Sequence, residues 1–246
     1  MIDLAVFSRE LTRVFDLNGL KPLLSERACE TLTRFSALLL SENEKVNLTA
    51  IRTPGEVILR HLADCAALCE HLPDSGRLLD VGCGAGFPSL VVAILCPGLS
   101  VTALDATGKK IAFVERCVGE LGIPNLTPLV GRAETLAGRG EPLRESFDLV
   151  TARAVARLPL LSELCLPFVS VGGTFLAMKG PIAEEEAREA AHAIELLGGE
   201  IRGIREKTLS DGCADTLSHA VVEVGKIRKS PDQYPRPYAQ IVKKPL

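Results

Sequence analysis

From Arg77 onward, short apolar runs alternate with segments of helical periodicity, and no other feature of the chain constrains its fold as strongly. This alternation is typical of a parallel β-sheet whose strands are joined by crossover helices. Helices are expected to begin near Pro88, Gly108, Leu158 and Ile182. The predicted strands are Leu78–Val81, Val101–Leu104, Leu126–Val130, Phe147–Thr151, Thr174–Met178, Ile201–Lys207 and Ala220–Val224. No helical segment separates the last two, so we expect them to form a hairpin at one edge of the sheet.

The first 73 residues have helical periodicity and predict three helices. In the first helix, apolar residues recur at helical spacing from Leu4 to Phe15. Ser25 can cap the second helix, and Pro54 can occupy the first turn of the third. The polar residues 43–50 have neither helical nor strand periodicity. The domains we expect are an N-terminal helical cap (1–73), a Rossmann-like core (74–224) and a C-terminal tail (225–246).

The composition is that of an ordinary globular protein, with 47% hydrophobic and 24% charged residues. It excludes a disordered or low-complexity chain. The formal net charge of −3 argues against a generic basic coat for nucleic acid. The charge is uneven, however, because residues 225–246 contain six basic side chains and one acidic side chain. The prolines of residues 230–237 disfavour a helix or central strand, so we expect an extended, basic surface tail packed on or near the core.

Eight cysteines and four histidines give no metal-binding pattern, since no two cysteines have C-x-x-C spacing. Most of the cysteines have apolar neighbours, as reduced thiols have in cytosolic proteins. Charged residues interrupt the N-terminus, so no signal peptide is predicted. The longest apolar run, Leu90–Cys96, is too short to cross a bilayer. We expect a cytoplasmic monomer without a metal or a membrane partner.

A glycine-rich turn, Asp80–Pro88, follows the first predicted strand and opens a helix. Its alternating glycines let the backbone bend sharply and let a ligand approach closely, and a tight turn without a ligand needs fewer of them. A nicotinamide dinucleotide turn places its third glycine one residue later, where this chain has Phe87. The spacing found here is that of S-adenosylmethionine-dependent methyltransferases, so we expect Gly82 and Gly84 to line a cofactor site.

Other candidate site residues lie at the ends of predicted strands, where ligands bind in open α/β sheets. Asp105 ends the second strand and can accept hydrogen bonds from both ribose hydroxyls of an adenosine; alternatively, it only caps the next helix. Ala133 and Glu134 follow the third strand and can bracket an adenine, and Arg153 follows the fourth. The alternatives are a solvated loop acid for Glu134 and a salt-bridge partner for Arg153, since lone charges are usually solvated. Their shared position at strand ends favours a binding site.

Several separated segments resemble the RsmG (GidB) family of bacterial methyltransferases, and together they span nearly the whole chain. The glycine turn alone is weak support, whereas an N-L-T segment, an R-H-x-x-D helix and a Y-P-R tail are specific together. The matching segments are Glu44–Ala50, Arg60–Asp64, Asp80–Pro88, Arg153-Ala154, Lys179-Gly180, Pro231–Arg236 and Lys243–Leu246. The chain departs from the family at Ser41, where Trp is frequent, at Cys65, which replaces a Ser, and at Ser89, which replaces a Gly.

The pattern and the resemblance predict a class I S-adenosylmethionine-dependent methyltransferase fold. This α/β, Rossmann-like fold has a mostly parallel seven-stranded sheet with an antiparallel edge, preceded by N-terminal helices. The resemblance implies S-adenosyl-L-methionine as cofactor, and Asp105 fits the usual ribose role. The family's cofactor contacts fall on Gly82, Phe87, Ala133, Glu134 and Arg153.

The resemblance also implies the substrate, a specific guanine of 16S rRNA methylated at N7, within a ribosomal particle or an assembly intermediate. Guanine N7 carries a lone pair and no proton, so the reaction needs alignment rather than a general base. We therefore expect no dedicated catalytic residue. Candidates for a surface facing RNA phosphates are Lys109, Lys110, Arg153, Arg157, Lys179 and the cations of the tail.

Three other functions remain open on the sequence. The first is methylation of a small molecule with the same cofactor, which the basic tail and the few aromatic residues disfavour. The second is a nicotinamide-dependent oxidoreductase, which the early third glycine disfavours. The third is a non-enzymatic adenosyl-binding regulator, which the composition does not distinguish from an enzyme.

Overall fold

The computed structural model describes residues 3–246, and its strands contain every predicted apolar run. They are β1 (Gly76–Val81), β2 (Leu99–Asp105), β3 (Leu126–Val130), β4 (Phe147–Arg153), β5 (Val169–Lys179), β6 (Gly199–Ser210) and β7 (Thr216–Lys226). The strand predictions are confirmed, and most strands extend beyond the runs that predicted them.

One sheet contains all seven strands, in the order β3-β2-β1-β4-β5-β7-β6. The pairs among β1 to β5 are parallel, whereas β7 is antiparallel to both β5 and β6. This arrangement confirms the predicted fold class and the antiparallel edge. The strand order reverses between β1 and β4, and ligands bind outside the carboxyl ends of strands at such a point.

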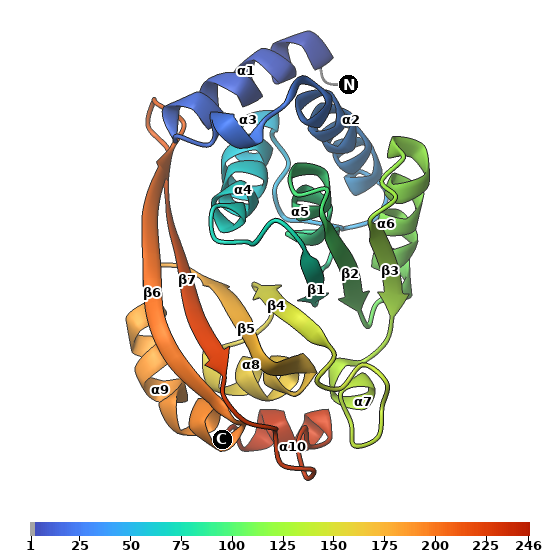
Figure 1. Cartoon of the computed structure of the whole chain (residues 1–246). Helices are drawn as coiled ribbons and strands as arrows, with labels where there is room; N and C mark the ends of the chain where they lie inside the picture. The colour runs from blue at the N-terminus through green and yellow to red at the C-terminus, as the bar shows by residue number, and fades with distance from the viewer. Residues whose placement is uncertain (1–2) are drawn as a thin grey trace.

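Helices cover both faces of the sheet (Figure 1). The upper face in Figure 1 is covered by α1 (Leu4–Leu17), α2 (Glu26–Asn43), α3 (Pro54–Val57), the π-helix η2 (Ile58–Ala63), α4 (Asp64–Cys69), α5 (Ser89–Leu95) and α6 (Gly108–Leu121). The lower face is covered by α7 (Ala133–Leu136), α8 (Leu158–Cys165), α9 (Ala183–Leu196) and α10 (Tyr238–Lys243). Two 3₁₀ turns, η1 (Lys21–Leu23) and η3 (Leu166–Phe168), complete the helical elements of residues 3–246.

The two apolar layers of the core follow from the alternation of side chains along each strand. In β1, Leu78 packs in the layer beneath α1–α6, and the next residue, Leu79, packs in the layer with α8 and α9. In β4, Leu149 and Val150 repeat the pattern. The N-terminal helices contribute fully buried side chains such as Phe35 to the first layer, so they share one core with the sheet.

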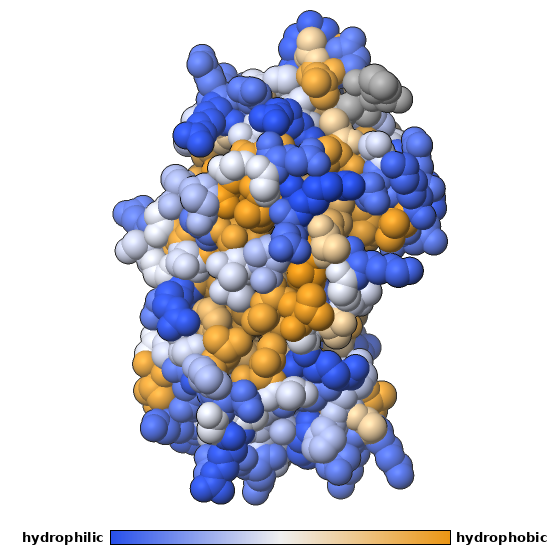
Figure 2. Space-filling view, turned by 90° about the vertical axis from the view of Figure 1, so that its right-hand side faces the viewer, coloured by the Kyte–Doolittle hydropathy of each residue, from blue (hydrophilic) through white to orange (hydrophobic). Residues whose placement is uncertain are grey.

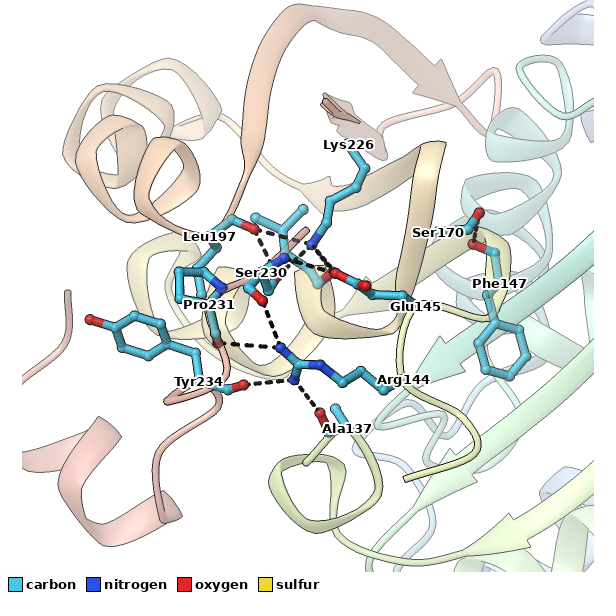
Figure 3. Close-up of polar contacts among 11 residues, drawn as sticks. Ala137, Arg144, Glu145, Phe147, Ser170, Leu197, Lys226, Ser230, Pro231 and Tyr234 are labelled. Atoms are coloured by element: carbon cyan, nitrogen blue, oxygen red, sulfur yellow. Dashed lines mark hydrogen bonds and ion pairs between the residues drawn. The ribbon is translucent and has the colours of Figure 1, made fainter. Parts of the chain in front are cut away.

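The C-terminal tail packs against the loop between α7 and β4 through polar contacts (Figure 3). The Arg144 guanidinium donates hydrogen bonds to the carbonyl oxygens of Ala137, Ser230, Pro231 and Tyr234, over 2.7–3.2 Å. Within residues 230–237, Ser230 and Tyr234 are buried and anchor the segment, whereas Asp232, Gln233 and Pro237 are exposed. The tail then ends in α10, a helix that the proline-rich sequence did not predict.

The face at the β3 edge of the sheet carries an exposed apolar surface. Figure 2 turns the right-hand side of Figure 1, where β3, α6 and α7 lie, toward the viewer. Apolar side chains gather in a band at mid-height of this face, between hydrophilic surfaces above and below. Val130, the last residue of β3, is 54% exposed. The segment that leads to Ala133 therefore starts beside an accessible apolar side chain.

Candidate functional site

The candidate site begins where β1 ends and the chain turns into α5. Gly82 and Gly84 have φ values of 76° and 57°, in the left-handed region that favours glycine. A Cβ atom at Gly82 would lie 2.6 Å from Cγ2 of Val155, whereas one at Gly84 would meet no atom within 4 Å. Gly82 thus packs the turn against the loop after β4, and Gly84 presents open backbone that a ligand can approach.

Asp105, at the end of β2, holds this turn in place. Its Oδ2 accepts a hydrogen bond from the Gly84 N–H at 3.0 Å, and its Oδ1 accepts one from the Thr107 N–H at 2.7 Å. The residue is only 8% exposed. A carboxylate offers about four acceptor positions, so Asp105 retains lone pairs for the hydroxyl groups of a ligand.

Ala133 and Glu134 begin α7, in the loop after β3, the strand next to β2. The Gly131 N–H donates to the Asp105 carbonyl at 3.1 Å and ties this loop to the end of β2. The Glu134 side chain is 11% exposed, and its Oε1 accepts from Nε of Arg132 at 2.5 Å. Glu134 is therefore not the solvated acid of the alternative interpretation, and its contacts join it to Arg132 rather than to the glycine turn.

Arg153, the last residue of β4, lies beside Phe87 of the glycine turn, with its guanidinium carbon 5.3 Å from the ring centroid. Nη1 donates to Oδ2 of Asp64 at 3.0 Å and to the Arg60 carbonyl at 2.9 Å. Nη2 is 2.9 Å from Nδ1 of His61. Arg153 is thus a salt-bridge partner, as the alternative interpretation had it, and it also lies at the carboxyl end of β4, where the strand order reverses.

Asp80 lies beneath the turn and is fully buried. Its Oδ2 accepts from the Ser89 N–H at 3.0 Å, and its Oδ1 has no partner among the described residues. Burial raises the pKa of this carboxyl to about 7. A buried oxygen without a partner, next to an open glycine turn, suits a cationic group of a ligand.

The sequence indicated no role for His61, Asp64 or His219, which the structure brings to Arg153. Nδ1 of His219 lies 2.8 Å from Oδ1 of Asp64, and the two residues are 155 positions apart in the chain. The spacing of His61 and Asp64 on one helical segment was the available signal, because residues three apart lie on the same side of a helix. No local pattern pointed to His219.

The expected phosphate-facing surface is wrong for several of its cations. The Lys179 side chain is only 9% exposed and its Nζ pairs with Glu186 at 2.7 Å, and Arg153 is enclosed by the contacts above. Lys226 of the tail is also fully buried. Among the remaining candidates, Arg157 is exposed but pairs with two glutamates, whereas Lys109 is exposed at the start of α6. The charge count of the sequence does not reveal which cations the fold pairs internally.

Two further expectations concern metal binding and membrane insertion. Within residues 3–246, no cluster of three or more His, Cys, Asp or Glu side chains is arranged to hold a metal ion. Over the same residues, no helix combines the length and the apolar character that crossing a membrane requires.

Comparison with known proteins points to one family. Residues 28–210 match the family described as GidB, rRNA small subunit methyltransferase G. The ribosomal RNA small subunit methyltransferase G of Lactobacillus johnsonii is 43% identical over 246 residues, which cover 98% of each chain. The proteins of the same name from Geobacillus kaustophilus and Deinococcus radiodurans are 44% and 46% identical, over 91% and 84% of this chain and 93% and 81% of theirs.

Solved structures agree on the fold. The crystal structure of M. jannaschii TYW2 in complex with AdoMet superposes with a TM-score of 0.56 and 13% identity, covering 74% of this chain and 80% of that one. A putative transferase, PH0793 from Pyrococcus horikoshii, gives a TM-score of 0.54 and 14% identity, over 72% and 65% of the two chains. At these identities the similarity shows the class I methyltransferase fold alone.

Proposed function

This chain belongs to the rRNA small subunit methyltransferase G family of S-adenosylmethionine-dependent methyltransferases, and we propose that it methylates N7 of a specific guanine in 16S rRNA. The observation that carries the proposal is 43% identity to a protein of that name over 98% of both chains. The resemblance stated from the motifs is thereby confirmed at the level of the family. The choice of guanine N7 follows from that resemblance and from the chemistry below.

The residues of the site fit S-adenosylmethionine. Gly84 leaves room for a ligand against the backbone, and Asp105 has lone pairs for the ribose hydroxyls. The Oδ1 of Asp80, which has no partner within residues 3–246, suits the ammonium group of the methionine part, and the guanidinium of Arg153 suits its carboxylate. Ala133 lies in the loop where an adenine would be bracketed. When bound, the cofactor supplies an electrophilic methyl group on its sulfonium.

The proposed reaction requires this chain to position the guanine N7 and the methyl group of the cofactor. The N7 lone pair lies in the plane of the base and carries no proton, so no side chain has to remove one. Holding two reacting groups close and in line can lower a barrier by several kcal/mol. The end of β4 and the loop that follows it, Thr151–Arg157, contain neither the Asn/Asp-Pro-Pro-aromatic element of exocyclic-amine methylation nor a Pro-Cys nucleophile. Both absences favour a ring nitrogen that needs no activation.

The target guanine must be accessible, because N7 lies in the deep, narrow major groove of a paired A-form helix. We therefore propose an unpaired or displaced base within a ribosomal particle or assembly intermediate, acted on by a cytoplasmic monomer. Lys109 at the start of α6 is the exposed cation nearest in sequence to Asp105 and belongs to the proposed RNA-facing surface.

A methyl-transfer assay with nucleoside mass analysis tests the proposal. Small ribosomal subunits from a strain lacking this gene are incubated with the purified protein and isotope-labelled S-adenosylmethionine. We expect the label in 7-methylguanosine from a single fragment of 16S rRNA. The Arg153→Ala variant should remain folded and give at least tenfold less labelled 7-methylguanosine. Label in another nucleoside, or only in a small molecule, would contradict the proposal.

A further inference from the structure

We infer that His61 and Asp64 are positioning residues that hold the Arg153 guanidinium beside Phe87, oriented toward the cofactor. The inference rests on the proposed role of Arg153 in cofactor binding. It assigns to η2 and α4 a part in the reaction beyond packing.

The contacts of Arg153 account for three of its five N–H groups. Both Nη1 hydrogens are used, one by the Arg60 carbonyl and one by Oδ2 of Asp64, and one Nη2 hydrogen is used by Nδ1 of His61. The Nε–H and the second Nη2–H have no acceptor among the described residues. Two donors on one planar group can bind the two oxygens of a carboxylate, and the fixed contacts decide where those donors point.

His61 can accept this hydrogen bond because it is neutral. The residue is 7% exposed, and burial together with the charge of Arg153 lowers its pKa to about 3. With Nδ1 as acceptor, the proton lies on Nε2, which donates to Oγ1 of Thr49 at 2.9 Å. The imidazole also stacks on Phe87, with ring centroids 4.2 Å apart. Thr49 and Phe87 therefore fix both the tautomer and the plane of the ring that Arg153 meets.

Asp64 fixes the guanidinium from the other side. Burial alone would raise the pKa of Asp64, but the hydrogen bond from His219 and the charge of Arg153 hold it below its ordinary value. The Asp64 N–H bonds to the carbonyls of Leu59 and His61, as the widened π-helix allows, and the Arg60 carbonyl accepts from Arg153. Short π segments inside helices occur frequently at functional sites.

A gain in folding stability does not explain why Arg153, Asp64 and His61 are buried together, because a buried ion pair is often no more stabilising than apolar residues of the same volume. The contacts instead hold the flexible Arg153 side chain in one position. Such positioning matters because a misplacement of about 1 Å can lower a rate on the order of 100-fold. All the hydrogen bonds of this group come from residues 49–64 and from β7, outside the loops that bind the cofactor in the proposal, and only the ring contacts with Phe87 reach the glycine turn. Substitutions of His61 or Asp64 are therefore expected to weaken cofactor binding through Arg153.

Calorimetric titration with S-adenosylhomocysteine tests the inference on the full-length protein. His61→Phe keeps a ring against Phe87 and removes both hydrogen bonds, so we expect its Kd to rise at least tenfold. His61→Asn keeps an acceptor near the position of Nδ1, and its Kd should stay within threefold of wild type. His71→Asn, a histidine outside the group, is the matched control and should bind like wild type.

A double-mutant cycle separates positioning from general packing. In an Arg153→Ala background, His61→Phe should leave the Kd unchanged, because the residue it positions is gone. Asp64→Asn is the second variant, for the case that His61→Phe does not fold, and its Kd should also rise at least tenfold. A folded His61→Phe or Asp64→Asn protein that binds like wild type, or an equal His61→Phe effect in the Arg153→Ala background, would overturn the inference. A wild-type protein that fails to bind S-adenosylhomocysteine would contradict the proposed function, and the inference with it.

Discussion

Asp105 combines two roles that a substitution can separate. It accepts two backbone N–H groups, and its remaining lone pairs are proposed to bind ribose. Asp105→Asn keeps one acceptor oxygen and removes the charge, so we expect the Kd of S-adenosylhomocysteine to rise at least tenfold, about 1.4 kcal/mol. Asp105→Ala also strands the N–H groups of Gly84 and Thr107 and should lower the free energy of unfolding by roughly 1–3 kcal/mol.

Titration calorimetry and urea denaturation measure these two effects. The matched control is Asp148→Asn, because the Asp148 carboxylate likewise accepts a backbone N–H, from Arg77 at 2.8 Å, but at the start of β4. The control should leave the Kd unchanged. A wild-type Kd for Asp105→Asn would remove Asp105 from the cofactor site.

Asp80 makes the stability of the free protein depend on pH. Its pKa is about 7 in the folded protein and near 4 in the unfolded chain, so the folded state holds the extra proton between these values. The free energy of unfolding therefore falls as pH rises from 4 to 7, by at most roughly 1.4 kcal/mol per pH unit from this group. Asp80→Asn removes that contribution, so the variant should gain stability relative to wild type across the same window.

Urea denaturation at several pH values from 4 to 8 measures the difference between Asp80→Asn and wild type. His61, with a folded pKa of about 3, acts in the opposite direction, since it favours the folded state as pH rises toward 6.5. Its contribution is common to both proteins and cancels in the difference. A difference that does not change with pH would show that Asp80 ionises normally.

At the scale of elements, the sheet could be predicted because each strand is specified by a local pattern. Runs such as Val101–Leu104 are apolar on both faces, as strands covered on both sides must be, and the structure confirms them. The glycine turn and Asp105 could be placed together for the same reason, since the turn follows β1 and Asp105 ends the neighbouring strand β2. The group around Arg153 could not be predicted in this way, because it includes Asp64 and His219, which contact each other but are 155 positions apart in the chain.

The tail shows a second element whose structure depends on distant partners. Arg236 pairs with Glu163 of α8, 73 positions earlier, and the Glu163 side chain is fully buried. Arg236→Met removes the charge paired with that buried carboxylate and leaves it only the hydrogen bond from the backbone N–H of residue 236, so we expect a loss of about 3–5 kcal/mol in the free energy of unfolding. The double variant with Glu163→Leu should recover most of the loss, because it removes the buried charge.

Urea denaturation of these variants needs a surface pair for comparison. Arg139 and Asp232 are 3.2 Å apart with side chains 77% and 66% exposed, so Arg139→Met should change the free energy of unfolding by less than about 1 kcal/mol. If Arg236→Met were as stable as Arg139→Met, the tail would not be held by this pair.

At the scale of the whole molecule, the fold redistributes the charge that the sequence counts. The tail contains six cations, but Lys226 is buried, Arg236 is paired with Glu163, and Arg228 donates to the Glu195 carbonyl. The remaining basic side chains lie on a chain of net charge −3. Attraction of RNA to the tail is therefore weaker than its sequence suggests, and in the proposed function shape recognition of the ribosomal particle supplies more of the affinity.

The small number of accessible cations on the tail predicts which form of the RNA is the better substrate. We expect kcat/KM for a protein-free short hairpin with the target guanine to be at least tenfold below that for intact small subunits or their RNA. Few phosphate contacts also predict a weak dependence on salt, with a slope of roughly −2 to −4 in a plot of log kcat/KM against log salt concentration. Methyl transfer to the hairpin and to the intact subunits, measured at salt concentrations from about 50 to about 200 mM, tests both the substrate preference and the salt slope.

Lys109→Ala at the exposed start of α6 should lower kcat/KM for the particle severalfold without changing the Kd of S-adenosylhomocysteine. Arg9→Ala, an exposed cation on α1, is the matched control and should leave both values unchanged. Equal efficiency on the hairpin and on intact subunits would mean that local RNA contacts suffice. The exposed cations that contact RNA would then have to be concentrated around the cofactor site, and a steep salt slope on the hairpin would reveal them.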